Sequence, residues 1–316
     1  MTSTLSKPPT PISGQTPELP PLTPALIQRA REGWEAASDR RVRQAIERAF
    51  DRLQDRVEGR SDGRISGRIR RRVLQGCVRL LFRVRVENLE NLPAEPFLLA
   101  ANHLNHIDPL LLLGELPATP YTYILGDARS LYNRRWKRFF LALSQGVIPL
   151  SRRWKEELAV MEGAKSGRED LAELAANIDR DVSDGKSIEM LRQIDRIVQS
   201  LFAGGDSLML FPEGKLGMTE GQLLPLKRGA LTYALRGGVP IVPVALVGTK
   251  NLYLRKELII RIGTPLRFPP SKRPKASQVT AATVALGEAI EDLLPRDYRE
   301  PQGRKLLRGF LNRMFL

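Results

Sequence analysis

The sequence has very few residues that could form a disulfide or bind a metal ion. Cys77 is its only cysteine, and His103 and His106 are its only histidines. One cysteine excludes an intramolecular disulfide, and these three residues cannot supply an ordinary structural zinc site. We therefore interpret Cys77 as a buried, unreactive thiol and expect a reducing compartment.

Sequence motifs for common cofactors are also missing. No Gly-x-Gly-x-x-Gly pattern occurs in the chain, and the EGK sequence at 213–215 lacks the upstream glycine of a phosphate-binding P-loop. We expect neither a cofactor nor a metal ion to be part of the protein.

Long apolar runs are absent as well. A membrane-spanning helix needs about 18–20 consecutive apolar residues, whereas the longest unbroken runs here resemble the leucines at 110–113. The first residues have neither the basic start nor the apolar stretch of a signal peptide, so we expect none. Any contact with a membrane should therefore be peripheral.

Acidic residues are outnumbered by basic ones. The chain has 50 Lys and Arg against 35 Asp and Glu, a net charge of +15. Over half of this excess lies at 60–85, where the only acid is Asp62. This charge favours anionic partners, namely nucleic acid, acidic lipid or a phosphate-bearing substrate, although a solvated basic face is the plain alternative. No motif interleaves aromatic residues with these arginines for base recognition, so we expect no nucleic acid.

Strand patterns alternate with helix patterns along the chain. Apolar or alternating runs predict strands at 82–86, at the run ending before Asn102, and at 121–127, 146–153, 207–211 and 241–248, and a further strand and turn at 257–268. Apolar residues at three- and four-residue steps predict helices from Pro24 to about Glu58, and at 108–117, 131–143, 188–201, 227–236 and 277–294. This alternation predicts an α/β architecture.

Both histidines lie in one stretch, FLLAANHLNHID at 97–108. An imidazole is the side chain best suited to act as a base near neutral pH, and the residues alone do not decide between His103 and His106. Asp108 could orient such a ring. Because Asp108 precedes Pro109, the same aspartate is also predicted to be the N-cap of a helix.

Four stretches occur in an order and spacing that resemble a known family. They are NHLNHID at 102–108, GVIPLSR at 146–152, FPEG at 211–214 and VPIVPVA at 239–245. Together they resemble the four motif blocks of the glycerophospholipid acyltransferase family, of the bacterial lysophosphatidate acyltransferase type. The resemblance implies a mixed central β-sheet flanked by helices. It also implies transfer of an acyl group from acyl-CoA or acyl carrier protein to a hydroxyl of a lysophospholipid acceptor.

The resemblance also implies roles for individual residues. His103 would be the general base and Asp108 its partner. Arg152, Glu213, Gly214 and Lys215 would form the site for the acceptor and its phosphate. The sequence departs from the family pattern at Lys215, where Ser or Thr is common, and at Pro149 and Ser151, which replace apolar and acidic residues.

A domain layout follows from the patterns and the resemblance together. We expect a disordered proline-rich tail at 1–24, a basic helical extension at 25–73, an acyltransferase domain at 74–300 with a helical insertion at 154–186, and an amphipathic basic helix at 301–316. The last helix has the pattern of a helix at a lipid interface, but docking on the protein's own surface fits equally well.

The function predicted from the sequence is O-acyl transfer to lysophosphatidate, which would make phosphatidate in phospholipid synthesis. Alternatives are another acceptor, such as glycerol 3-phosphate, another lysophospholipid or a glycolipid, and a basic nucleic-acid-binding protein. The predicted location is cytoplasmic, peripheral on the inner face of the cytoplasmic membrane, where basic residues would contact the anionic membrane surface.

Overall fold

The structure is a computed structural model that describes residues 19–60, 63–129, 146–182 and 188–315. Contacts divide the chain into two compact units. The first comprises Met1–Asp39 and Arg152–Asp184, and the second comprises Arg40–Ser151 and Gly185–Leu316. The units follow contacts rather than chain order, and they leave the predicted domain boundaries untested.

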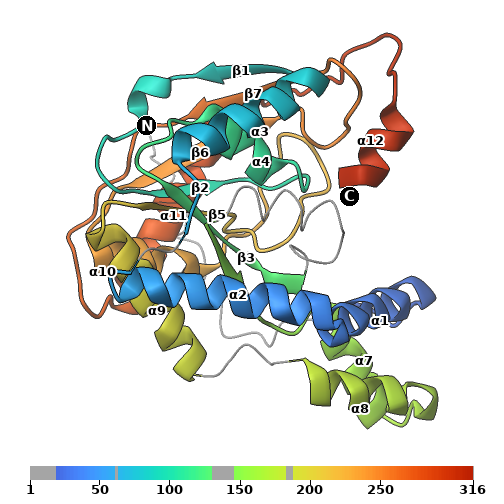
Figure 1. Cartoon of the computed structure of the whole chain (residues 1–316). Helices are drawn as coiled ribbons and strands as arrows, with labels where there is room; N and C mark the ends of the chain where they lie inside the picture. Colours follow the sequence, from blue (N-terminus) through green and yellow to red (C-terminus); the bar gives the residue numbers. More distant parts are fainter. Residues whose placement is uncertain (1–18, 61–62, 130–145, 183–187, 316) are drawn as a thin grey trace, which may run out of the picture. The chain divides into compact units, whose positions relative to one another are not determined.

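The second unit is built on a seven-stranded mixed sheet (Figure 1). Its strands are β1 (Arg83–Glu87), β2 (Leu98–Ala101), β3 (Thr122–Asp127), β4 (Val147–Leu150), β5 (Ser207–Leu210), β6 (Ile241–Val247) and β7 (Glu257–Ile262). They lie in the order β1-β7-β6-β2-β5-β3-β4, and every neighbouring pair is parallel except β6 and β7. The predicted α/β fold with a mixed, helix-flanked sheet is confirmed.

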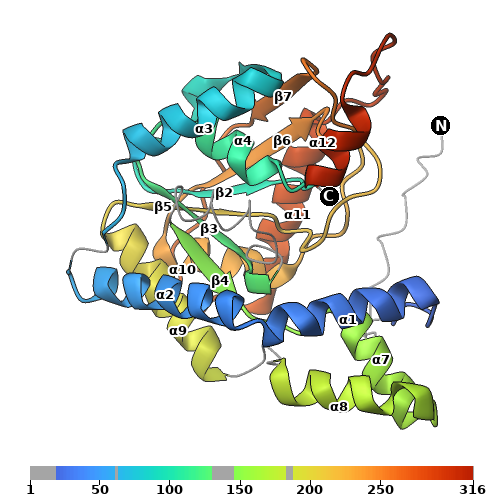
Figure 2. The same ribbon diagram turned by 45° about the vertical axis from the view of Figure 1, so that its right-hand side comes forward.

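Helices cover both faces of this sheet, as Figure 2 shows. One face carries α3 (Gly67–Leu81), α4 (Asp108–Glu115) and α12 (Arg308–Phe315). The other carries α2 (Arg40–Val57), α9 (Ile188–Ala203), α10 (Thr232–Gly237) and α11 (Ala276–Leu293). Alternate residues of a strand point to opposite faces, so Leu99 packs in the first core and Leu98 in the second. The central strand β2 is therefore buried on both sides.

The first unit is a small helical cluster. It contains α1 (Pro24–Ser38), α7 (Lys155–Lys165) and α8 (Ala172–Asp181), which pack around Ala30, Val160 and Ile178. The Trp34 indole N–H donates to Asp181 at 2.8 Å. Thr23 caps α1, since its hydroxyl accepts the Leu26 N–H at 3.2 Å and Pro24 occupies the first turn.

Two local predictions were wrong. The helix predicted from Pro24 to Glu58 is two helices, because the backbone is extended at Asp39 and the Ser38 hydroxyl bonds back to the Trp34 carbonyl. The thiol of Cys77 is exposed rather than buried. It lies on α3, where the neighbouring Leu74 and Val78 are buried in the core but Cys77 is not. The helix predicted at 131–143 lies outside the described residues.

The C-terminal helix α12 docks on the sheet unit. Leu311 and Phe315 are buried in the first core, whereas Leu306, Leu307 and Phe310 are 60%, 52% and 58% exposed. The helix therefore has a buried side and an exposed side, and two exposed leucines precede it. Within the part of the chain that the structure describes, no helix has both the length and the apolar character needed to cross a bilayer.

Candidate active site

The candidate site lies where three parallel strands, β2, β5 and β6, end. Ala100 of β2 pairs with Leu210 of β5 and with Pro243 of β6. His103 lies three residues after Ala100, and Glu213 lies three residues after Leu210. Since Ala100 and Leu210 are neighbours in the sheet, His103 and Glu213 follow the same end of it. Ligands of parallel α/β sheets commonly bind beyond the carboxyl ends of the strands.

His103 and Asp108 form a hydrogen-bonded pair. The Nδ1 atom of the His103 ring lies 2.8 Å from Oδ2 of Asp108. Asp108 is fully buried, and the His103 side chain is 15% exposed. With Nδ1–H donating to the carboxylate, Nε2 retains a lone pair and can accept a proton. This is the arrangement of a base and its orienting carboxylate.

The carboxylate of Asp108 is itself held by the turn before α4. Its Oδ2 atom also accepts the backbone N–H groups of Leu104 and Asn105, at 2.8 and 2.9 Å. The prediction that Asp108 is an N-cap was wrong: α4 begins at Asp108 with Ile107 before it, and the carboxylate binds N–H groups that precede the helix. Its negative charge still lies at the positive end of the helix dipole.

His106 is in a different environment. Its ring centroid lies 6.1 Å from that of His103, and its backbone N–H donates to the Phe315 carbonyl at 3.2 Å. The carboxylate of Asp108 contacts the His103 ring. The structure thus pairs His103, the histidine that the family resemblance favoured, with a carboxylate.

The backbone of His103 is clamped on both sides by the FPEG loop. Its N–H donates to Oε1 of Glu213 at 2.7 Å, and its carbonyl accepts the Gly217 N–H at 2.6 Å. A Cβ on Gly217 would lie 2.9 Å from Leu104 Cδ2, so a side chain there would have to displace the buried Leu104 side chain or the loop. The other oxygen of Glu213 accepts the Leu224 N–H at 2.9 Å. Burial raises the pKa of the Glu213 carboxyl, and these two N–H donors oppose that rise.

Two residues that the sequence analysis did not single out also position the histidine. The Phe211 ring stacks on the His103 ring with centroids 4.0 Å apart. The buried Asn102 amide bonds to both backbone groups of Leu246, accepting its N–H at 2.6 Å and donating to its carbonyl at 3.0 Å. Asn102 thereby ties the end of β2 to β6. Both are the first residues of their motif blocks, but their contacts depend on neighbouring strands.

The remaining predicted site residues lie as follows. Gly214 adopts a left-handed conformation with φ 67° and donates its N–H to the Phe211 carbonyl, which makes the tight turn of FPEG. Lys215 is exposed. Arg152 belongs to the first compact unit, and its role in holding phosphate remains a prediction.

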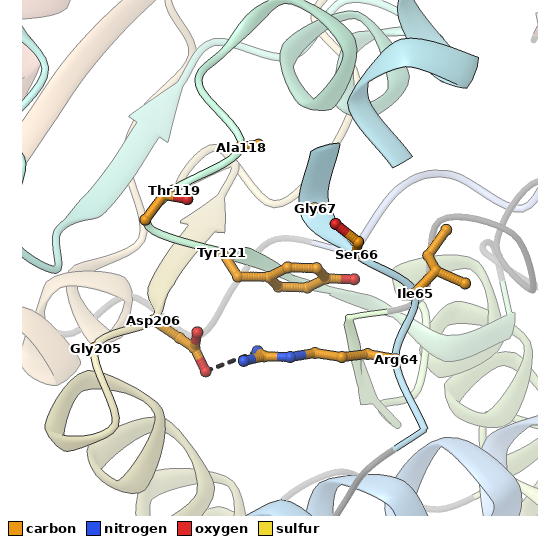
Figure 3. A pocket seen from close by; sticks show the side chains of 9 residues that line it. All are labelled: Arg64, Ile65, Ser66, Gly67, Ala118, Thr119, Tyr121, Gly205 and Asp206. Atoms are coloured by element: carbon orange, nitrogen blue, oxygen red, sulfur yellow. Dashed lines mark hydrogen bonds and ion pairs between the residues drawn. The ribbon is translucent and has the colours of Figure 1, made fainter. Parts of the chain in front are cut away.

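A pocket of about 310 Å³ lies elsewhere, where β3 and β5 begin rather than end (Figure 3). Arg64 crosses it to Asp206, with Nη1 to Oδ2 at 2.9 Å, and stacks over Tyr121 at 4.5 Å from the ring centroid. Because its charges neutralise each other, we interpret this pocket as structural.

A family model described as Acyltransferase matches residues 83–247, more than half of the chain. The chain belongs to the acyltransferase family. The matched range contains the His103 and Asp108 pair, the FPEG loop and the central strands. In this acyltransferase the His103 and Asp108 pair therefore follows β2, the strand at the middle of the sheet.

The chain is also similar to individual curated proteins and to a solved structure. The chain is 27% identical over 216 residues to the 1-acyl-sn-glycerol-3-phosphate acyltransferase of Bacillus subtilis, covering 66% of this chain and 87% of that one. It is 29% identical over 171 residues to a probable 1-acyl-sn-glycerol-3-phosphate acyltransferase of Mycoplasma pneumoniae, covering 53% of this chain and 50% of that one. A crystal structure of the 1-acyl-sn-glycerophosphate acyltransferase of Thermotoga maritima superimposes with a TM-score of 0.44 at 18% identity, over 74% of this chain and 80% of that one.

Proposed function

We propose that this acyltransferase moves a fatty acyl group from a thioester, either acyl-CoA or acyl carrier protein, to the free hydroxyl of lysophosphatidate, which yields phosphatidate. The observation that carries this proposal is the His103 and Asp108 pair, with Nδ1 bonded to the carboxylate at 2.8 Å. The names of the curated relatives support the choice of acceptor.

The chemistry follows from that pair. Nε2 of His103 takes the proton of the acceptor hydroxyl as its oxygen attacks the thioester carbonyl carbon. The new C–O bond forms a tetrahedral intermediate, which collapses with cleavage of the C–S bond. The imidazolium then protonates the departing thiolate, so the histidine returns to its starting state. Asp108 keeps the ring in the correct tautomer and stabilises the imidazolium.

The acceptor carries a phosphate, and two basic residues in or next to the motif blocks are candidates to hold it. Arg152 can hold a phosphate through two parallel hydrogen bonds. Lys215 is exposed on the loop that clamps His103 and can add a point charge. The net charge of +15 favours a peripheral location on the anionic inner face of the cytoplasmic membrane.

The role of His103 is tested by two matched histidine variants. His103→Ala should lower kcat by about 10²- to 10⁴-fold because the hydroxyl loses its base. His106→Ala serves as the control and should stay within about 3-fold of the parent protein, since it is the His103 ring that Oδ2 of Asp108 bonds. Both variants must keep the parent's circular dichroism spectrum. Equal losses in the two variants would refute the assignment.

The acceptor is tested with purified full-length protein. Acyl-CoA and acyl carrier protein are each offered with lysophosphatidate, glycerol 3-phosphate, lysophosphatidylcholine and a lysoglycolipid, and products are read by mass. We expect phosphatidate to dominate. A higher kcat/KM for any other acceptor would overturn lysophosphatidate as the substrate.

Arg152→Ala tests the phosphate site. The variant should mainly raise KM for lysophosphatidate, by about 10-fold or more, because a charge-assisted contact to the phosphate is lost. Its KM for an acceptor without phosphate should not change. An unchanged KM for lysophosphatidate would remove Arg152 from the site.

A further inference from the structure

The helix α12 has an inner side that fixes it and an outer side that nothing in the described chain covers. On the inner side Leu311 is buried, and the Asn312 amide bonds both backbone groups of Leu252, accepting its N–H at 3.0 Å and donating to its carbonyl at 2.9 Å. On the outer side, Phe310 is 58% exposed. Because the Asn312 amide bonds both backbone groups of Leu252, it fixes the rotation of α12 about its own axis. Phe310 is therefore kept on the exposed side.

The segment before α12 lies beside the end of α3. The carbonyl of Leu306 accepts the Leu254 N–H at 2.9 Å, and the next residue, Arg255, donates its N–H to the Leu81 carbonyl at 2.6 Å. The Arg255 guanidinium reaches the Arg79 carbonyl at 3.2 Å. Leu80, which is 74% exposed, precedes Leu81 at this end of the helix. The end of α3 and the segment before α12, which are distant in the sequence, are therefore both bonded to residues 254–255, and each carries an exposed leucine.

The same segments carry exposed arginines. Arg304, Arg308 and Arg313 lie on the C-terminal segment, and Arg83 and Arg255 lie next to the residues that join it to α3. Among the residues that the structure describes, no carboxylate is paired with any of these five within 4.0 Å. The acids of this part of the chain have other partners: Glu115 pairs with Arg79, Glu257 with Arg85, and Glu300 with Lys256 and Lys305. Exposed large apolar side chains together with arginines that lack a carboxylate partner are the composition that binds anionic bilayers.

The same helix reaches the catalytic block. The carbonyl of Phe315, in the last turn of α12, accepts the backbone N–H of His106 at 3.2 Å. His106 follows His103 by three residues on the turn that Asp108 organises. A surface bound through α12 therefore lies next to the histidine turn, where a lipid acceptor has to arrive.

We propose that Leu80, Leu306, Leu307 and Phe310, with the arginines around them, form the surface on which this protein docks to an anionic membrane. We call it the docking surface. The purpose of this surface, which is to bring the histidine turn to a lipid acceptor, rests on the proposed function. We assign the membrane contact to two segments, the end of α3 and residues 304–313, that are far apart in the sequence.

The test uses vesicle flotation with the full-length protein. One variant, Leu306→Ser with Phe310→Ser, removes exposed apolar groups, and a second, Arg304→Glu with Arg308→Glu, reverses exposed charges. The matched control, Val284→Ser with Arg192→Glu, changes an exposed apolar residue and an exposed arginine on α11 and α9, which cover the opposite face of the sheet. The vesicles contain phosphatidylcholine alone or phosphatidylcholine with phosphatidylglycerol.

We expect the parent protein and the control to float with the phosphatidylglycerol vesicles only. The arginine variant should bind at least about 5-fold more weakly for each charge removed. The serine variant should bind more weakly as well, and both should retain turnover on a short-chain, water-soluble lysophosphatidate. Binding equal to that of the control would overturn the docking surface. So would a change in oligomeric state in place of a change in vesicle binding, because the surface would then contact a second copy.

This experiment separates the docking surface from the proposed function. If the parent protein floats, the variants do not, and no acceptor is acylated, the surface stands and the proposed function fails. If acyl transfer occurs but flotation is the same for every variant, the function stands and the surface fails.

Discussion

Replacing Asp108 by asparagine separates the shape of its carboxylate from its charge. Oδ2 accepts three donors, the His103 ring N–H and two backbone N–H groups. An amide of the same shape can present either its oxygen or its NH₂ at that position. The two backbone donors decide between them, because an NH₂ group there would face two N–H groups that it cannot bind. The amide oxygen therefore takes the place of Oδ2, and the His103 tautomer is kept.

The expected loss of kcat in Asp108→Asn depends on which amide atom takes the place of Oδ2. In a serine protease triad, the equivalent change inverts the histidine tautomer and lowers turnover by about 10⁴-fold. Here the tautomer is kept, so only the charge is lost. A hydrogen bond to a charged group exceeds one to a neutral group by about 1–2 kcal/mol, which corresponds to about 5- to 30-fold in kcat. Asp108→Asn should therefore be far more active than His103→Ala.

Stability should also change in Asp108→Asn. In the described part of the chain, Oδ1 of Asp108 is buried without a hydrogen-bond partner. The NH₂ group placed there would lack an acceptor, which costs about 1–3 kcal/mol. Asp108→Ala should cost about 2–6 kcal/mol, because it leaves the N–H groups of Leu104 and Asn105 buried and unpaired.

The measurements are kcat with lysophosphatidate and acyl-CoA, and urea unfolding of the same preparations. A loss of about 10⁴-fold in Asp108→Asn would refute the reasoning, since it would mean that the amide turns its NH₂ toward the histidine. An Asp108→Ala variant as stable as the parent protein would contradict the account of the two N–H groups.

Two further changes test the clamp on His103. Glu213→Gln replaces two acceptor oxygens by one, so either the His103 or the Leu224 N–H loses its partner, and unfolding should become easier by about 1–3 kcal/mol. Because burial raises the Glu213 pKa above 4.5, the folded parent protein binds a proton more readily than the unfolded chain. The Glu213 carboxyl should therefore increase the free energy of unfolding of the parent protein as the pH falls from neutral toward 4.5. Glu213→Gln lacks this group, so a urea midpoint with the same pH dependence in the variant and in the parent protein would contradict this. Gly217→Ala should lower kcat by about 10-fold or more, because the new methyl would lie 2.9 Å from Leu104 Cδ2 and displace the loop from the His103 carbonyl; unchanged kcat would show that the loop can yield.

Much of the fold could be predicted from periodicity alone. The apolar runs at 207–211 and 241–248 are strands β5 and β6, and the three- and four-residue steps from Ile194 to Leu201 lie on α9. Helix ends were less predictable. The helix predicted across Asp39 breaks because its two halves pack in different clusters, which a local pattern does not encode.

The candidate site could be predicted only in part. His103 and Asp108 are five residues apart, so one turn brings them together, and a motif search can find them. Asn102 and Phe211 were missed as positioning residues because their partners, Leu246 and His103, are more than 100 residues away. Their role depends on strand order, which the sequence pattern leaves open.

The sequence by itself determined the scarce histidines, the order of the motif blocks, the excess of positive charge and the alternation of strand and helix, because each depends on residue identity and short spacing. Tertiary structure alone decided that Asn102 ties β2 to β6, that Glu213 holds the backbone N–H of His103, and that the end of α3 and the segment before α12 both bond to residues 254–255. These facts depend on which strands are neighbours and on where the chain returns, since hydrogen bonds act over about 3 Å between residues that can be hundreds of positions apart.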